Sequence, residues 1–240
     1  MSARAPSRVL VACLGFGVLS VLGWARPPPG DAQSPGAIRG AGARKKERVT
    51  TFAPVPLSKL RVTQGALRER TDGRLDVEGA RLRAIVPGTN TTSRAELRFS
   101  LRGSSSEQRA LQSGEQRQQA GLKLRARDGC NVLYVMWRLA PKADIVVNYK
   151  RNPDQHHSSD CGNRGYVTVR PFRRSAVSAP SKGEEHTLRA ELAGVTLRVW
   201  ADDSLVWEGD LPPEALALDG PVGLRSDNVR LTLQLRVPPP

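Results

Sequence analysis

The sequence has no segment in which apolar residues keep a helical spacing. They recur instead at every second position in short runs, as at Leu231, Leu233 and Leu235, with turn residues between the runs. A period of two places the apolar side chains of a strand on one face. Because helical patterns are missing between the runs, a βαβ fold is excluded. The sequence therefore predicts an all-β fold, a two-layer antiparallel β-sandwich.

Motifs for nucleic-acid binding are also missing, although basic residues outnumber acidic ones by 37 to 23 and the formal net charge is +14. There is no zinc-finger spacing, no RNP-like aromatic strand and no basic helix, so we expect no nucleic-acid partner. The positive field instead favours an anionic polysaccharide or a membrane surface. Ordinary solvated side chains are the alternative explanation for the charge.

Metal-binding spacings are missing as well. Asp154, His156, His157 and Asp160 form the one concentration of possible ligands, and imidazole and carboxylate groups suit divalent metals. The established zinc spacings do not occur here, and a closed polar loop is the simpler interpretation. We therefore predict no metal and no cofactor.

Cysteine is scarce, with three residues in the chain. Cys13 lies in the N-terminal segment, where Arg4 and Arg8 precede an uncharged apolar run over residues 9–25. This order is typical of a signal peptide and predicts a secreted or periplasmic protein. Two alternatives stay open: the run is kept as a membrane anchor, or a lipobox-like segment at residues 10–13 places a lipid on Cys13. The excess of Arg over Lys, with frequent Ala, Gly and Pro, indicates a GC-rich bacterial genome.

The two remaining cysteines, Cys130 and Cys161, form an even set in a chain with an export signal. An oxidising compartment favours a disulfide between them. Two buried free thiols are the alternative if the protein stays in the cytosol. We predict the disulfide.

The chain divides into three segments by composition. Residues 1–25 are the signal peptide or N-terminal anchor, and residues 26–48 form a flexible linker rich in Pro and Gly with a basic end. Residues 49–240 carry the strand pattern and are expected to form the β-sandwich domain. Within it, the polar stretch 103–120 is long for a hairpin loop and is expected to be functional or disordered. The continuous apolar run 132–137 predicts a central strand buried on both faces.

The C-terminal third resembles a known superfamily. The resemblance is carried by residues 186–189, 197–203, 205–209 and 220–226. Their order is a strand, a second strand with Trp200, the turn at Asp202 and Asp203, a third strand with Trp207, and a final Gly-Leu strand. This order is similar to the closing strands of concanavalin A-like lectin and glucanase jelly rolls. The resemblance implies a jelly-roll sandwich and a carbohydrate ligand.

The same resemblance leaves two functions open. One is a binding module for carbohydrate or a cell-envelope polymer, without catalysis, and the other is a divergent glycoside hydrolase. Enzymes of the superfamily carry two acidic residues that face one cleft, and retaining hydrolysis needs two carboxyl groups about 5 Å apart. Glu184 and Glu185 are adjacent, as are Asp202 and Asp203, so each pair would point to opposite faces of a strand. We therefore assign no catalytic residues and favour binding.

The candidate ligand-binding residues lie in two places. The first is the polar loop between the cysteines, because function tends to lie on loops carried by a rigid sheet. Its candidates are Lys150, Arg151, Asn152, Gln155, His156, His157, Asn163 and Arg164. The second is the pair Trp200 and Trp207, whose rings either pack in the core or stack on a sugar. The expected partner is a polysaccharide or an anionic envelope polymer.

Overall fold

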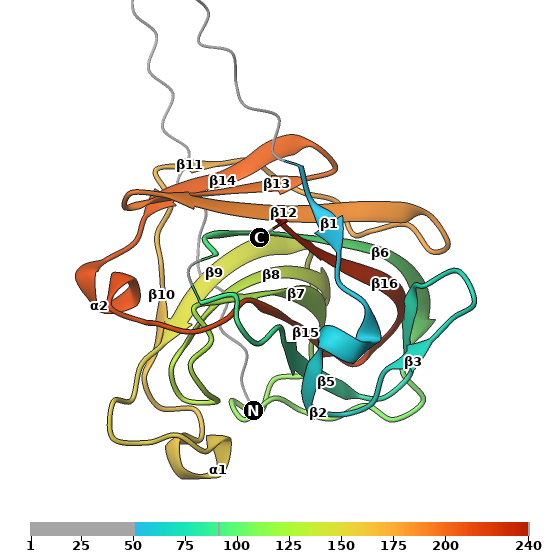
Figure 1. Ribbon diagram of the computed structural model, residues 1–240, viewed down its shortest axis with the longest axis horizontal. Coiled ribbons are helices and arrows are strands. Elements are labelled where there is room, and N and C mark those ends of the chain that lie inside the picture. The colour runs from blue at the N-terminus through green and yellow to red at the C-terminus, as the bar shows by residue number, and fades with distance from the viewer. Residues whose placement is uncertain (1–50, 91, 240) are drawn as a thin grey trace, which may run out of the picture. The chain divides into compact units, whose positions relative to one another are not determined.

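The computed structural model describes residues 51–90 and 92–239. These residues form two antiparallel β-sheets packed face to face (Figure 1), which confirms the predicted two-layer sandwich. The predictions for the signal peptide, the anchor, Cys13 and the linker concern residues 1–48, which lie outside the described residues. In the part of the chain that the structure describes, no helix has both the length and the apolar character to cross a membrane.

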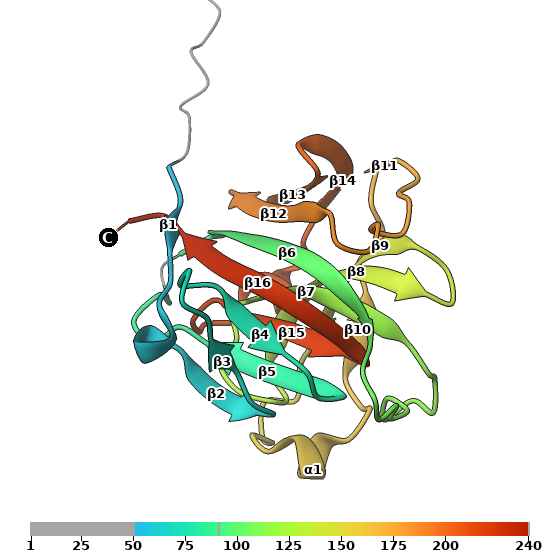
Figure 2. The same cartoon turned by 90° about the vertical axis from the view of Figure 1, so that its right-hand side faces the viewer.

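The larger sheet has nine strands, eight of them in one continuous order. These eight are β11 (Arg173–Arg174), β14 (Ser204–Asp210), β13 (Thr196–Ala201), β12 (Glu185–Ala193), β6 (Arg94–Ser104), β16 (Val229–Val237), β4 (Leu75–Val77) and β3 (Arg68–Glu69). The ninth, β1 (Ala53–Pro54), pairs with the end of β16. Figure 2 shows the long strands β6 and β16 running side by side in this sheet.

The smaller sheet has seven strands. Their order is β10 (Tyr166–Thr168), β9 (Asp144–Lys150), β8 (Val132–Ala140), β7 (Gln118–Leu124), β15 (Gly223–Asp227), β5 (Arg81–Ile85) and β2 (Arg61–Gln64). Among the described residues, helical structure is limited to short turns: η1 (Leu57–Lys59), α1 (Ser158–Cys161) and α2 (Pro213–Leu216). α1 lies at the bottom of both Figure 1 and Figure 2, on the long connection between β9 and β10.

The tight turn between β13 and β14 is made by the two aspartates singled out in the sequence. Asp202 and Asp203 both have positive φ angles, 46° and 62°. Two consecutive residues with positive φ are what a two-residue hairpin loop of the type I′ class requires, and Asp adopts this conformation more readily than most residues. The carboxylate of Asp202 also accepts a hydrogen bond from the Thr187 amide at 2.8 Å.

The core lies between the sheets and consists of apolar side chains at alternate strand positions. Phe99 on β6 and Trp137 on β8 are both buried, and their rings meet edge to face with centroids 5.8 Å apart. Because β6 and β8 belong to different sheets, this contact joins the two layers. An aromatic pair of this kind contributes about 0.5–1.5 kcal/mol beyond the burial of its area.

The strand β8 is buried on both faces, as the apolar run 132–137 predicts. Val135 and Trp137 belong to the main core, whereas Tyr134 and Met136 point away from it. A second, smaller apolar cluster on that side consists of Ile85, Ala126, Val132, Tyr134 and Met136. The outer face of the smaller sheet therefore carries an apolar cluster that is separate from the main core.

The side chain of one asparagine, Asn228, holds the polar stretch between β6 and β7 against the sandwich through hydrogen bonds. The Asn228 side chain accepts a hydrogen bond from the Arg109 amide at 2.8 Å and donates to the carbonyls of Arg109 and Arg117, each at 2.9 Å. Asn228 lies between β15 and β16, has a positive φ of 59° and is fully buried. The connection between the sheets thus fixes the position of this long loop.

A disulfide joins Cys130 and Cys161, as predicted, with their Cα atoms 5.9 Å apart. Cys130 stands just before β8 and Cys161 ends α1, so the bond ties the long connection after β9 to the start of a central strand. Both cysteines are fully buried.

We expect that replacing both cysteines by serine lowers the free energy of unfolding. The bond closes a loop with a sequence separation of 31 residues, and the chain-entropy model gives about 3–4 kcal/mol for a loop of this size. Urea unfolding of the wild type and of the Cys130→Ser, Cys161→Ser double variant measures the difference. Dithiothreitol should lower the stability of the wild type and leave the double variant unchanged, and equal stabilities without reductant would contradict the prediction.

Candidate functional site

A cavity of about 870 Å³ lies on the outer face of the smaller sheet. Its lining residues alternate along the strands with core residues: Gln119 and Lys123 of β7 line the cavity, whereas Ala120 and Leu122 point into the core. The same alternation brings side chains from β5, β8, β9, β10 and β15 into the lining. We call this space the sheet-face cavity.

Two loops complete the walls of the sheet-face cavity. The loop between β6 and β7 contributes Gln112, and the disulfide-bonded loop contributes His157 and Ser158. The loops contact each other, because the Gln112 side-chain amide donates a hydrogen bond to the Ser158 carbonyl at 3.3 Å. The long polar loop predicted to be functional or disordered is thus an ordered part of the candidate site.

The floor of the cavity is built around one carboxylate. Asp227 accepts hydrogen bonds from Arg83 at 2.6 Å, from Arg225 at 2.8 Å and from Gln119 at 2.7 Å. Burial opposes ionisation of Asp227, but the two guanidinium groups outweigh it and lower the pKa of this carboxyl to about 2. Asp227 is therefore a fixed anion whose hydrogen-bonding capacity is used within the protein.

Two tyrosines lie beside this network. The rings of Tyr134 and Tyr166 stack with centroids 6.1 Å apart and an interplanar angle of 23°. The Arg225 guanidinium lies 4.7 Å from the Tyr134 ring centroid and donates to the Tyr166 hydroxyl at 3.3 Å. Tyr134 is buried, and burial raises its pKa to about 12. Tyr166 is 36% exposed and lines the cavity, so it is more accessible to a ligand than the buried Tyr134.

Lys123 is the most unusual group of the floor. It is only 5% exposed, and within residues 51–90 and 92–239 its ammonium group makes no hydrogen bond or ion pair. Burial, followed by the charges of Arg83 and Arg225, lowers the pKa of Lys123 to about 8. We call Arg83, Lys123 and Arg225 the cationic floor. Arg83 and Arg225 share the carboxylate of Asp227, whereas the carboxylate that favours the charged form of Lys123 is that of Asp128.

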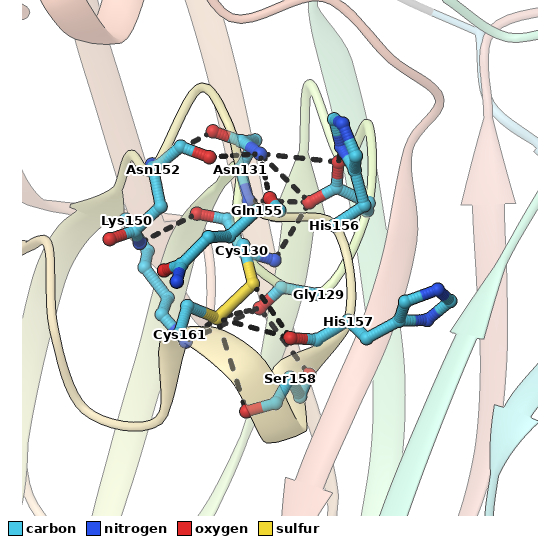
Figure 3. Close-up of polar contacts among 11 residues, drawn as sticks. Gly129, Cys130, Asn131, Lys150, Asn152, Gln155, His156, His157, Ser158 and Cys161 are labelled. Atoms are coloured by element: carbon cyan, nitrogen blue, oxygen red, sulfur yellow. Dashed lines mark hydrogen bonds and ion pairs between the residues drawn. A yellow bond between two sulfur atoms is a disulfide. The ribbon is translucent and has the colours of Figure 1, made fainter.

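Lys150, a predicted ligand residue, is buried beneath the disulfide loop (Figure 3). Its ammonium group donates to the carbonyl of Gly162 at 2.6 Å and to Sγ of Cys161 at 2.9 Å, with the Gly129 carbonyl at 3.4 Å. It also lies 5.1 Å from the Tyr166 ring centroid. Lys150 thus lines the cavity while its hydrogen bonds hold the loop.

A second network fixes the same loop to the start of β8 (Figure 3). The Asn131 side chain donates to the carbonyls of Asn152 and Gln155, each at 3.0 Å, and accepts from the Asn152 amide at 2.9 Å. Asp128 accepts from the amides of Cys130 and Asn131, and its other oxygen lies 2.8 Å from Nδ1 of His156. The loop is therefore held by polar contacts as well as by the disulfide.

The structure brings four of the predicted loop residues into the cavity lining and leaves four outside it. Those in the lining are Lys150, His156, His157 and Asn163; those outside are Arg151, Asn152, Gln155 and Arg164. Asn152 and Gln155 hold the loop through Asn131, and Arg164 donates back to the Asp160 carbonyl. In the described part of the chain no group of three or more His, Cys, Asp or Glu residues could hold a metal ion.

Neither predicted tryptophan reaches the cavity. Trp207 is 1% exposed and packs in the main core, so no face of its ring is open to a sugar. The inclusion of Trp207 among the ligand residues is thus corrected, because its strand position points inward. Trp200 lies on the larger sheet with the Arg189 guanidinium 4.3 Å from its ring centroid, outside the cavity lining.

Sequence analysis missed the residues that form the floor, namely Arg83, Gln119, Lys123, Tyr134, Tyr166 and Arg225. The signal was present as charged residues between apolar ones, such as Lys123 between Leu122 and Leu124. Such a residue looks like an ordinary solvent-facing strand position unless the strand order is known. The pairing of β15 with both β5 and β7 is what collects these positions.

The acidic residues of the cavity lining form ion pairs or hydrogen bonds with neighbouring side chains. Glu115 pairs with Arg117, and Asp128 is held by Asn131 and His156. A retaining glycoside hydrolase needs two carboxyl groups close together, one of them able to donate a proton. The buried Asp227 lies between two guanidinium groups and does not meet that need.

No protein-family model matches the sequence, and no curated protein matches it. Among solved structures, the chain is similar to the carbohydrate-binding module CBM66 from Bacillus subtilis, with 12% identity, a TM-score of 0.52 and coverage of 73% of this chain and 92% of that one. It is also similar to a protein of unknown function with a galectin-like fold from Bacillus subtilis, with 10% identity, a TM-score of 0.50 and coverage of 78% and 97%. Identities this low establish the fold alone. At the level of the fold, these similarities agree with the predicted antiparallel β-sandwich of the jelly-roll type.

We expect Lys123→Met to raise the free energy of unfolding at pH 7. The pKa of Lys123 is about 8 in the folded chain against an ordinary 10.5, so below pH 8 the folded state carries the full cost of a buried cation. A lowering of this size corresponds to roughly 3 kcal/mol. That cost is relieved as the pH rises from about 8 to 10.5, where the unfolded chain binds more protons than the folded one.

Urea unfolding of both proteins between pH 7 and pH 10 checks this prediction. The stability advantage of the variant should shrink as the pH rises. Taking the difference between the two proteins removes the titration of other groups, including Tyr134, and a variant that is less stable at pH 7 would show that Lys123 has a structural role.

Proposed function

We propose that this chain, which has the jelly-roll fold of the concanavalin A-like lectins and glucanases, is an exported bacterial protein that binds a carbohydrate or cell-envelope polymer in the sheet-face cavity. It acts as a binding module, without catalysis. The observation that carries the proposal is the cavity itself, where the open ring of Tyr166 lies beside polar side chains held in fixed positions.

Saccharide binding suits this combination of groups. A sugar ring presents an apolar face of C–H groups that packs on an aromatic ring, and hydroxyl groups that need hydrogen-bond partners. Tyr166 supplies the ring, supported from below by Tyr134. Asn148 and Thr168 from neighbouring strands also line the cavity and offer polar groups beside it.

Several features support the wider proposal. The disulfide between Cys130 and Cys161 fits an oxidising compartment outside the cytoplasm, in agreement with the export signal expected at residues 1–25. The similar structure from Bacillus subtilis is described as a carbohydrate-binding module, and it shares this fold over most of its length. Retention of the N-terminal run as an anchor would hold the binding domain at the membrane surface.

We expect Tyr166→Ala to weaken saccharide binding at least tenfold, because it removes the exposed ring at the cavity. Binding of the full chain to a glycan array, followed by titration calorimetry with the best oligosaccharide, measures the effect. Phe172→Ala is the matched control, since Phe172 is 65% exposed and lies outside the cavity lining. It should leave binding unchanged.

A second control tests the alternative site on the larger sheet. Trp200→Ala should not change the affinity, because Trp200 lies outside the cavity lining. Loss of binding in Trp200→Ala with full binding in Tyr166→Ala would move the site to the larger sheet. Release of reducing sugar by the wild type would instead support the hydrolase alternative.

A further inference from the structure

We propose that the cationic floor is an anion-binding subsite that receives the carboxylate or sulfate group of an acidic saccharide, with Lys123 as its central residue. The inference rests on the proposed function, because it assigns a chemical class to the saccharide bound in the same cavity. It is argued from charge, burial and the contacts of the floor residues.

The charges of the floor do not balance. Arg83 and Arg225 are cross-strand partners on β5 and β15, and like charges directly opposite each other are destabilising. Both guanidinium groups share the carboxylate of Asp227. Lys123 adds a third cation, and both Arg83 and Arg225 disfavour its charged form. An anionic ligand would supply the missing negative charge.

The lack of a partner is what separates Lys123 from the other buried cation of this face. Lys150 is equally buried, but its ammonium group donates to two loop carbonyls and a sulfur atom. Lys123 has none of these contacts among the residues that the structure describes. Burying an unpaired charge costs free energy, and an apolar side chain of similar length would avoid that cost. A ligand that pairs with the ammonium group explains why a lysine stands there.

A second cation at the cavity has unused donors. Arg138 on β8 lines the cavity opposite Gln119 of β7, and its Nε is buried without a hydrogen-bond partner. In the described chain Arg138 makes no hydrogen bond or ion pair, since Asp144 pairs with Arg174 and Glu115 with Arg117. A guanidinium group with free donors suits carboxylate and sulfate oxygens.

The position of Lys123 matches the proposed saccharide site. Lys123 and Tyr134 are cross-strand partners on β7 and β8, and Tyr134 stacks with Tyr166. Side chains directly opposite on neighbouring strands lie about 5 Å apart at Cβ. A sugar that packs on Tyr166 would therefore carry an acidic substituent within reach of Lys123.

The titration of Lys123 gives an independent readout. A bound anion favours the protonated amine, so complex formation above about pH 8 should take up a proton, and the affinity should fall as the pH rises past that value. The charged or titratable groups facing Lys123 are Arg83, Arg225, Arg61, Asp128 and Tyr134. Burial and the neighbouring guanidinium groups lower the pKa of Lys123 to about 8.

The test uses the full chain and a glycan array that carries each glycan in matched acidic and neutral forms. Polygalacturonate and its methyl ester report on carboxylate, and dextran sulfate and dextran report on sulfate. We expect the acidic forms to bind at least tenfold more tightly than their neutral counterparts. The array also shows which of the two anionic groups the floor accepts.

Lys123→Met and Arg138→Met should each reduce the ratio of acidic-glycan to neutral-glycan affinity at least tenfold. Lys142→Met is the matched control, because Lys142 is exposed and lies outside the cavity lining. Thermal unfolding confirms that each variant is folded. Proton uptake at pH 8.5, measured calorimetrically in buffers of different ionisation enthalpy, should disappear in Lys123→Met.

The outcomes separate this inference from the proposed function. Equal binding of acidic and neutral forms, weakened by Tyr166→Ala, would overturn the anion subsite and leave the saccharide site intact. Acidic glycans that bind Lys123→Met and Arg138→Met as tightly as the wild type would also overturn it. If no glycan of either form binds, both proposals fail together.

Discussion

The contact of Asp227 with Arg83 and Arg225 is the interaction on which the outer face of the smaller sheet depends. Two guanidinium groups on adjacent strands would repel each other without a shared counter-charge. The carboxylate, fixed further by Gln119, lets β5, β7 and β15 present polar groups at one place beneath a cavity. The main core lies on the opposite face, so the sheet separates the apolar packing that holds the fold from the charges that form the site.

Much of the fold was predictable because a period of two is a local property. The run 132–137 identified β8 as a central strand, and Asp202 and Asp203 identified a hairpin turn before any pairing was known. The disulfide followed from two cysteines and the export signal expected at residues 1–25. Each of these inferences needs only neighbouring residues or a count, together with general rules for strands, turns and redox compartment.

The site was less predictable because it depends on which strands are neighbours. Arg83, Lys123 and Arg225 lie far apart in the sequence and meet only through the pairing of β15 with β5 and β7. The polar loop between the cysteines borders the cavity, yet Asn152 and Gln155 among its candidates hold the loop itself. Composition could not distinguish a polar side chain that faces a ligand from one that bonds its own backbone. For Trp207, the phase of its strand decided in favour of the core.

The disulfide between Cys130 and Cys161 also determines which part of the cavity depends on a covalent bond. The carbonyls that receive the Lys150 ammonium group belong to Gly129 and Gly162, each next to one of the bonded cysteines. One rim of the cavity is thus assembled around a sulfur–sulfur bond, while the layers beneath it rely on apolar packing. Reduction of this bond would therefore loosen the rim of the cavity, whereas the two layers would keep their apolar packing.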